Sequence, residues 1–243
     1  MSEPCLTIGR DDRDDEGNLR PDQLIEVRRV LHDRGFVLLP SDTAYSIAAW
    51  LRGVQMRKRL NTMLGREDHE PLSAAFPSVA AVQDWTTQNR LADELLDRFA
   101  PGPITVVRSA ARRIPVEFTK EILKSSNHTI GVRITDSAVE RQVAAVGRSP
   151  ITTVPVRRLT AEGPRKPVVT SFGEAVDIVR KRTELIGGAL WCAIEGEIQY
   201  SHTSTVVEVL GEGGSYAFRR EDGPFLAEIR AYLDGRGDSQ AAD

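Results

Sequence analysis

Hydrophobic residues follow a helical spacing early in the chain and then form a short continuous run. The stretch after Pro21, DQLIEVRRVLHDRG, has apolar residues at Leu24, Ile25, Val27, Val30 and Leu31. This spacing predicts a helix that packs on one face and ends near Gly35. The apolar run FVLLP, which starts at Phe36 and ends at Pro40, predicts a buried strand.

The same alternation continues along the rest of the chain. Helices are expected in residues 54–64, 81–85 and 89–100, and strands in residues 104–107, 129–134, 151–156 and 205–210. The GEGG run at 211–214 lies between VVEVL and YAF and predicts a hairpin. Helices that alternate with strands imply a mixed or largely parallel sheet covered by helices, with ligand-binding turns at the strand ends.

The two ends of the chain differ in composition from its middle. Residues 1–20 contain six acidic and three basic residues and few apolar ones, so we expect a loose acidic leader there. Residues 234–243, DGRGDSQAAD, are polar and are expected to form a flexible tail. The sequence therefore predicts one domain over residues 21–233 of the 243-residue chain.

Charge and cysteine content exclude several classes of protein. The formal net charge of −3 argues against a generic nucleic-acid binder, although basic clusters occur at 57–59, 108–113 and 157–166. No segment has the apolar length of a membrane span, so we expect a cytoplasmic protein that has no membrane partner. Cys5 and Cys192 are distant in sequence from each other and from the four histidines, and no metal site is expected.

Short motifs for nucleotide binding or nucleophilic catalysis are absent. The glycines at 187–188 and 211–214 lack the following Lys-Ser/Thr of a P-loop, and no GxGxxG follows a predicted strand. His128 and His202 have no partnered nucleophile motif such as GxSxG. The sequence therefore supports neither a P-loop, nor a dinucleotide fingerprint, nor a catalytic triad.

Five separated segments resemble those of the YrdC-like family and occur in the family's order. They are LLPSDTAYSIA from Leu38, LGREDHEPL from Leu64, APGPITVV from Ala100, TIGVRITD from Thr129, and HTSTVVEV from His202 followed by AFR at 217–219. The resemblance implies an α/β fold with a twisted mixed sheet covered by helices around a deep basic cavity. It also implies that threonine, bicarbonate and ATP give threonylcarbamoyl-AMP and pyrophosphate, which a partner enzyme system uses for tRNA threonylcarbamoyladenosine modification.

The chemistry of that reaction indicates which residue types matter. A triphosphate must be held while a carboxylate-like oxygen attacks its α-phosphorus, so fixed cations and hydrogen-bond donors are needed more than a protein nucleophile. Arg66 and Arg133 are the candidate catalytic residues, and a planar guanidinium can bind phosphate or carboxylate through two hydrogen bonds. Mg²⁺ is expected to accompany the ATP. The residues expected at the nucleotide are Arg66, Thr153, Arg157, Ser204 and Arg219.

The residues after the first predicted strand are candidates for binding the amino acid. Thr43 can offer a hydroxyl and Tyr45 an aromatic wall, and Arg133 is expected to join them. The alternative is that Asp42 and Thr43 cap a turn and that Tyr45 belongs to the core. Both interpretations are compatible with the sequence.

Four positions depart from the family's pattern. Leu64 occupies the place of a lysine two residues before Arg66, and Pro155 and Arg157 stand where the family has the serine and asparagine of Ser-x-Asn. Proline removes a backbone donor as well as a hydroxyl. Arg157 can supply a charge in place of the lost lysine, and Ser46 replaces a glycine after Tyr45.

These departures leave three functions open. The first is a divergent synthase that forms a carbamoyl-type adenylate. The second is a paralogue that binds or hydrolyses an existing acyl adenylate or another nucleotide. The third is a noncatalytic module that binds RNA or a protein partner through a basic cavity, for which a continuous basic face is expected. An active synthase predicts that Arg66, Arg133, Arg157 and Arg219 converge on one cavity.

Overall fold

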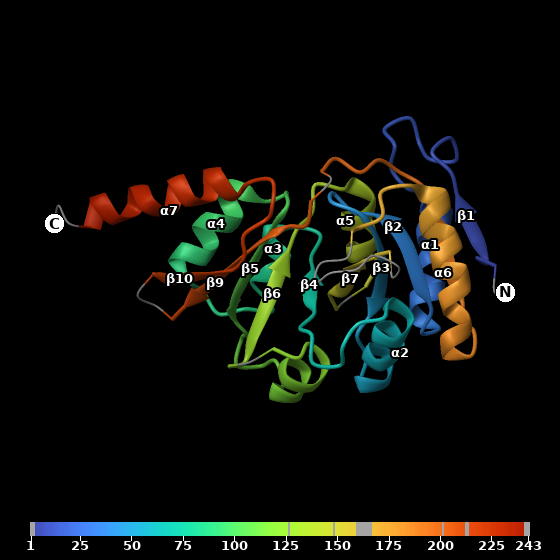
Figure 1. Cartoon of the computed structure of the whole chain (residues 1–243), viewed down its shortest axis with the longest axis horizontal. Coiled ribbons are helices and arrows are strands. Elements are labelled where there is room, and N and C mark those ends of the chain that lie inside the picture. The colour runs from blue at the N-terminus through green and yellow to red at the C-terminus, as the bar shows by residue number, and fades with distance from the viewer. Residues whose placement is uncertain are drawn as a thin grey trace.

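The computed structural model describes residues 3–125, 127–147, 149–158, 167–200, 202–211 and 214–240. In these residues ten strands form one mixed sheet with the order β1-β8-β2-β3-β7-β4-β6-β5-β9-β10. Figure 1 shows this twisted sheet, with β1 and helix α7 at opposite ends of the molecule. The fold class predicted from the sequence, a twisted mixed α/β sheet covered by helices, is confirmed.

The strands pair in both directions. The pairs β1–β8, β2–β8, β4–β6 and β5–β9 are parallel, whereas β2–β3, β3–β7, β4–β7, β5–β6 and β9–β10 are antiparallel. The antiparallel pairing of β9 with β10 agrees with the hairpin expected around residues 211–214, of which 212 and 213 lie outside the described residues. The strands are β1 Leu6–Ile8, β2 Phe36–Pro40, β3 Tyr45–Trp50, β4 Ser73–Ala75, β5 Ile104–Ser109, β6 Thr129–Arg133, β7 Ile151–Pro155, β8 Trp191–Ile194, β9 Thr205–Leu210 and β10 Ser215–Arg220.

Helices cover both faces of the sheet. Apolar residues of α1 and α5 pack in one hydrophobic cluster, and those of α2, α4, α6 and α7 pack in the other. The helices are α1 Pro21–His32, α2 Val54–Leu64, α3 Val79–Val82, α4 Arg90–Phe99, α5 Ala138–Ala145, α6 Phe172–Thr183 and α7 Leu226–Gln240, with a π-helix η1 Phe118–Ile122 and a 3-10 helix η2 Glu184–Ile186. No helix within the described ranges has the length and apolar character needed to cross a bilayer.

Strand β2 shows how the sequence pattern positions the sheet between two cores. All five of its residues are buried, as the apolar run predicts. Because side chains alternate along a strand, Phe36 and Leu38 join the cluster with α2 and α6, whereas Val37 and Leu39 join the cluster with α1 and α5. The strand therefore ends between two packed layers, which hold the following residues, 41–43, in place at the end of β2.

Both chain ends carry more structure than the composition suggests. Residues 6–8 form β1, which pairs in parallel with β8, and Leu19 is 3% exposed. The ordered fold thus begins inside the segment expected to be a loose leader. At the other end α7 continues to Gln240, inside the expected tail, and its Ile229 and Leu233 are buried in the core. A few apolar residues suffice to anchor each end, because they meet apolar surface that is distant in sequence.

Candidate functional site

A cavity of about 470 Å³ lies across the middle of the sheet. Its described lining comes from the turn after β2, the loop between α2 and β4, strands β4 to β7, and the ends of β9 and β10. Four arginines and three carboxylates are among the lining residues. The charged residues are Arg66, Arg133, Arg157, Arg220, Glu67, Glu70 and Asp222.

Arg133, the last residue of β6, is the most firmly held of these arginines. It is 7% exposed and forms an ion pair with the fully buried Asp42. Its Nη2 also donates to the hydroxyls of Thr43 at 3.1 Å and Ser41 at 3.3 Å. Burial disfavours the charged guanidinium, but the carboxyl groups of Asp42 and Glu140 outweigh burial and raise the pKa of Arg133. This arginine is thus charged and fixed in direction.

A buried carboxyl, Glu140 of α5, lies beside that ion pair. Glu140 is 1% exposed, and its Oε1 accepts a hydrogen bond of 2.7 Å from the hydroxyl of Thr153 on β7. Burial raises the pKa of Glu140, Arg133 opposes this shift, and the negative charge of Asp42 adds to it. Thr153 itself lines the cavity, whereas Glu140 is not among the lining residues. Sequence reasoning missed Glu140, because a lone glutamate on a helix carries no motif.

Arg66 is placed by the end of α2. Gly65 caps this helix in the left-handed conformation, with a φ of 62°, and the chain then turns so that the Arg66 N–H donates to the carbonyl of Asn61. The Arg66 side chain donates to Asn61 Oδ1 at 3.2 Å and to the Pro71 carbonyl at 3.1 Å. Burial lowers the pKa of Arg66, the ion pair with Glu70 at 3.3 Å opposes this shift, and nearby Arg157 adds to it. An anion between these two guanidinium groups would relieve that repulsion.

The structure corrects the prediction for Arg219. The side chain of Arg219 is 61% exposed and pairs with Glu208 outside the cavity, and the next residue, Arg220, lines the cavity instead. The register of β9 and β10 shifts between Phe218 and Arg220. Such a shift changes which side of a strand a given residue occupies, and the sequence pattern does not reveal it.

Ser204 supports Arg220 from behind the cavity wall. Arg220 donates from Nε to the Ser204 carbonyl at 2.7 Å and from Nη2 to the Ser204 hydroxyl at 2.9 Å. Ser204 is fully buried and also bonds the hydroxyl of Thr105 at 3.0 Å. Thr105 and Thr203 line the cavity, whereas Ser204 does not. The structure therefore gives Ser204 the role of a support for Arg220.

Tyr45 belongs to the core, as the alternative interpretation has it. Its hydroxyl donates to the Gly196 carbonyl at 2.7 Å and accepts from the Gly196 N–H at 3.0 Å. Its ring packs against Phe172 at a centroid distance of 5.6 Å. Thr43 lines the cavity, whereas Tyr45, which was expected as an aromatic wall, does not.

The departures from the family pattern lie in the cavity wall. Leu64 is 4% exposed and lines the cavity, and so does Pro155, which pairs with Ser46 across β3 and β7. Among the described lining residues there is no lysine. The basic segment 159–166 lies outside the described residues. In the part of the chain that is described, the positive charge of the cavity therefore comes from arginines.

Two of the predicted basic clusters supply structural ion pairs. Arg57 is 1% exposed and pairs with Asp68, and Arg108 is 3% exposed and pairs with Asp93 at 2.7 Å. Neither Arg57 nor Arg108 is a lining residue of the cavity. The described ranges contain no group of three or more His, Cys, Asp or Glu side chains that could hold a metal ion by themselves.

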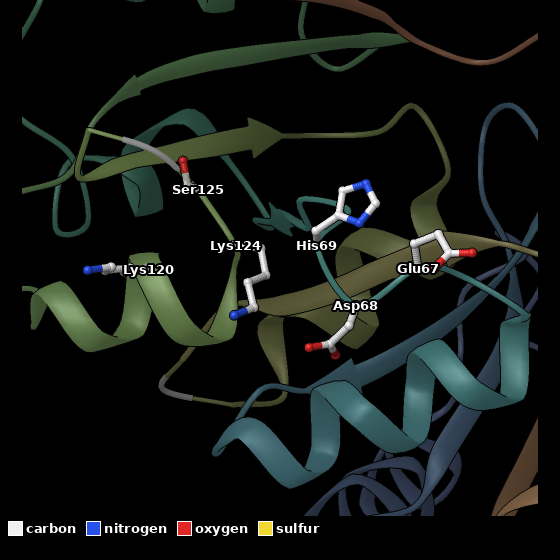
Figure 2. Close-up of a pocket in the computed structure, with 6 residues that line it drawn as sticks. All are labelled: Glu67, Asp68, His69, Lys120, Lys124 and Ser125. Carbon is white, nitrogen blue, oxygen red and sulfur yellow. The ribbon is translucent and has the colours of Figure 1, made fainter.

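A second hollow of about 440 Å³ lies beside the cavity, and Glu67 lines both. Figure 2 shows its six lining residues on the loop after α2 and around η1; Lys124 extends toward Asp68, and Lys120 points away from the loop. Lys124 pairs with Glu121 at 3.3 Å, and Asp68 pairs with Arg57. Lys124 and Asp68 thus pair with residues that do not line the hollow. The lining residues are Glu67, Asp68, His69, Lys120, Lys124 and Ser125.

The fold is thus an α/β protein with a twisted mixed sheet, and the arginines and threonines around its central cavity are residue types that suit anionic ligands. The sequence model of the Sua5/YciO/YrdC family, described as "Telomere recombination", matches residues 29–221. The chain belongs to this family.

Named relatives agree with that assignment. A Methanocaldococcus jannaschii protein assigned as a threonylcarbamoyl-AMP synthase is 25% identical over 173 residues, which cover 71% of this chain and 73% of that protein. The threonylcarbamoyl-AMP synthase of Mus musculus is 29% identical over 118 residues, which cover 47% of this chain and 39% of the mouse protein.

Solved structures share the fold at lower identity. The P. abyssi Sua5 structure complexed with L-threonine has a TM-score of 0.71 and 20% identity, and the match covers 93% of this chain and 59% of that one. The E. coli YciO structure has a TM-score of 0.72 and 15% identity, and the match covers 93% and 98% of the two chains. The chain thus spans about three fifths of P. abyssi Sua5 and nearly all of YciO.

Proposed function

We propose that this chain is an enzyme that forms threonylcarbamoyl-AMP from ATP, bicarbonate and threonine. The observation that carries the proposal is the convergence of Arg66, Arg133, Arg157 and Arg220 on one cavity. The names of the relatives and the threonine in the P. abyssi Sua5 structure support this substrate class. A partner of the tRNA-modification pathway, either another enzyme or the RNA itself, would then receive the product.

The proposed reaction needs positioning and charge more than a protein nucleophile. Threonine and bicarbonate condense to a carbamate with loss of water, a carbamate oxygen attacks the α-phosphorus of ATP, and the bond to the β-phosphate breaks to release pyrophosphate. Charge that develops on the phosphoryl oxygens is stabilised best by donors that are already fixed in place. The candidates for this role are Arg66, Arg157 and Arg220.

Arg133 and Thr43 are proposed to bind the amino acid and the carbamate. The Arg133 guanidinium is fixed by Asp42, and its position at the end of β6 lets it meet a carboxylate at the cavity wall. Mg²⁺ is proposed to arrive with ATP, because this ion usually keeps several waters and is held by substrate phosphates with one or two carboxylates. The carboxylates available in the lining are Glu67, Glu70 and Asp222.

The test is an assay of the purified chain with ATP, Mg²⁺, bicarbonate and threonine. We expect threonine-dependent release of pyrophosphate, with threonylcarbamoyl-AMP identified by mass spectrometry, and no release when threonine or bicarbonate is omitted. Tight binding of ATP or AMP without turnover would contradict the proposed synthesis.

Leu64 favours a second candidate, a paralogue that binds or hydrolyses an acyl adenylate. An apolar side chain lines the cavity where the family pattern has a lysine, so the end of the site that would hold pyrophosphate has one cation fewer. Leu64→Lys should strengthen ATP binding by about tenfold if that end of the cavity is open, since a charge-assisted hydrogen bond contributes about 1.5–3 kcal/mol. Tighter ATP binding without a change in AMP binding would point to a site that evolved away from triphosphates.

A further inference from the structure

Two threonine hydroxyls in the cavity have hydrogen bonds of opposite direction. Thr43 Oγ1 accepts a hydrogen bond of 3.1 Å from Arg133 Nη2, whereas Thr153 Oγ1 donates one of 2.7 Å to Glu140 Oε1. A hydroxyl has one proton and two acceptor lone pairs. Thr43 therefore keeps its proton available as a donor, and Thr153 has only lone pairs left to offer.

Glu140 is held rigidly at the start of α5. Its backbone N–H donates to the capping hydroxyl of Ser137 at 3.3 Å, and its side chain is 1% exposed. The second carboxyl oxygen, Oε2, is buried and has no hydrogen-bond partner within 3.5 Å, although the Ser41 hydroxyl, which donates to Asp42 at 3.2 Å, lies near enough to lower the pKa of Glu140 slightly. A buried carboxyl with an unfilled oxygen costs free energy. A role for Glu140 in the site would explain why this costly group is present.

We propose that Glu140 is a positioning residue that turns the Thr153 hydroxyl into an acceptor for a donor group of the bound amino acid. This inference rests on the proposed function, which places an amino acid in the cavity. Thr43 and Arg133 then face the carboxylate of the amino acid, and Thr153 faces its ammonium or hydroxyl group. Glu140 acts through Thr153 and does not touch the substrate.

The charged groups that face Glu140 agree with this role. Arg133 and Asp42 already form an ion pair, so a second carboxylate is not needed to neutralise the guanidinium. What Glu140 alone supplies is the acceptor for Thr153. A glutamine amide oxygen can supply the same acceptor, whereas a leucine of similar size cannot.

The test is calorimetric titration of L-threonine and, separately, of ATP into wild type, Glu140→Leu, Glu140→Gln, Thr153→Val and the double variant Glu140→Leu/Thr153→Val. We expect Glu140→Leu and Thr153→Val each to weaken threonine binding by about tenfold, since one hydrogen bond to a charged group is lost or misdirected. Glu140→Gln should recover affinity to within about threefold. The double variant should bind threonine no more weakly than Thr153→Val. The proposal assigns Thr153, which the sequence predicts at the nucleotide, to the amino acid, so ATP affinity should stay unchanged in Glu140→Leu and Glu140→Gln.

Three results would overturn the role of Glu140. These are wild-type threonine affinity in Glu140→Leu, an equal loss in Glu140→Gln and Glu140→Leu, and a parallel loss of ATP affinity that indicates general damage to the cavity. The proposed function fails separately: a wild type that binds threonine in a Glu140-dependent manner and releases no pyrophosphate would contradict the synthase and uphold the positioning role. A wild type that binds no amino acid would contradict both.

Discussion

Two neighbouring hollows have nearly the same volume, about 470 and 440 Å³, and share Glu67 in their walls, yet they differ in how their charges are held. In the central cavity Arg133 is bound to Asp42, Thr43 and Ser41, and each of these partners is almost fully buried. In the outer hollow (Figure 2) the exposed Lys120 and the half-buried Lys124 are long side chains, the first within η1 and the second just after it.

This difference shows that restraint distinguishes a site better than size does. A guanidinium fixed before a ligand arrives loses little freedom on binding, whereas an exposed lysine loses side-chain entropy and is screened by water and salt. The central cavity is therefore the one whose charges can stabilise a transition state. The following changes test the contrast, from the largest expected effect to the smallest.

Replacing Arg133 should have the largest effect. Arg133→Met leaves the fully buried Asp42 without its cation, which should lower the free energy of unfolding by about 3 kcal/mol. Loss of a preorganised cation should also lower the rate of pyrophosphate release by about 1000-fold. Chemical denaturation and the synthase assay measure the two effects. A variant with unchanged stability would show that the Asp42 pair is not the constraint described here.

Adjacent arginines on β10 offer a matched pair of variants. Arg220→Ala removes a cavity side chain and should weaken ATP binding by about tenfold, as expected for a charge-assisted hydrogen bond. Arg219→Ala removes an exposed side chain that pairs with Glu208, and ATP binding should change less than twofold, a typical result for exposed ion pairs. Calorimetric titration with ATP compares them. The opposite ranking would mean that the strand register differs from the one described.

The pH dependence of stability should report the burial of Glu140. Burial raises the pKa of Glu140 above its ordinary value of 4.5, so folding favours the protonated carboxyl. The protonated Glu140 carboxyl contributes its full stabilisation below the ordinary pKa of 4.5, and this contribution is lost as the pH rises through the raised pKa of the folded state. Glu140→Gln cannot ionise, so its melting temperature relative to wild type should increase from pH 4.5 upward. A constant difference between the two melting curves at all pH values would show that Glu140 has no raised pKa.

Changes in the outer hollow should have the smallest effect. Lys120→Ala and Lys124→Ala, singly and together, should change pyrophosphate release and ATP affinity by less than about twofold, because exposed pairs contribute little. The measurements are the same as for Arg133→Met. A tenfold or larger loss of ATP affinity or of the rate of pyrophosphate release would show that the outer hollow is also part of the site.

Some features were predictable because they depend on local pattern alone. The buried run FVLLP, the helix 54–64 and the order of the family segments are readable from residue types and spacing. The family segments pointed to Thr43, Arg66 and Arg133, and the stretch where the family has Ser-x-Asn pointed to Thr153 and Arg157. All five residues line the central cavity.

Other features depend on contacts between distant parts of the chain. The buried Tyr45 hydroxyl donates a hydrogen bond to the carbonyl of Gly196, which lies 151 residues away. Strand β1 forms by parallel pairing with β8, which is also distant in sequence. Arg220 reaches the cavity in place of Arg219 because the register of β10 on β9 shifts, an event that leaves the alternation of residue types unchanged.

The sequence by itself determined that this is a helix-covered sheet with arginines near the strand ends, because periodicity and strand-end polarity are local properties. Only the tertiary structure decided which arginines share a cavity, which hydroxyls donate and which accept, and that Glu140 lies beside Thr153. Those outcomes depend on strand register and on burial in three dimensions, where partners 90 to 92 residues away set the charge and direction of the Arg133 side chain.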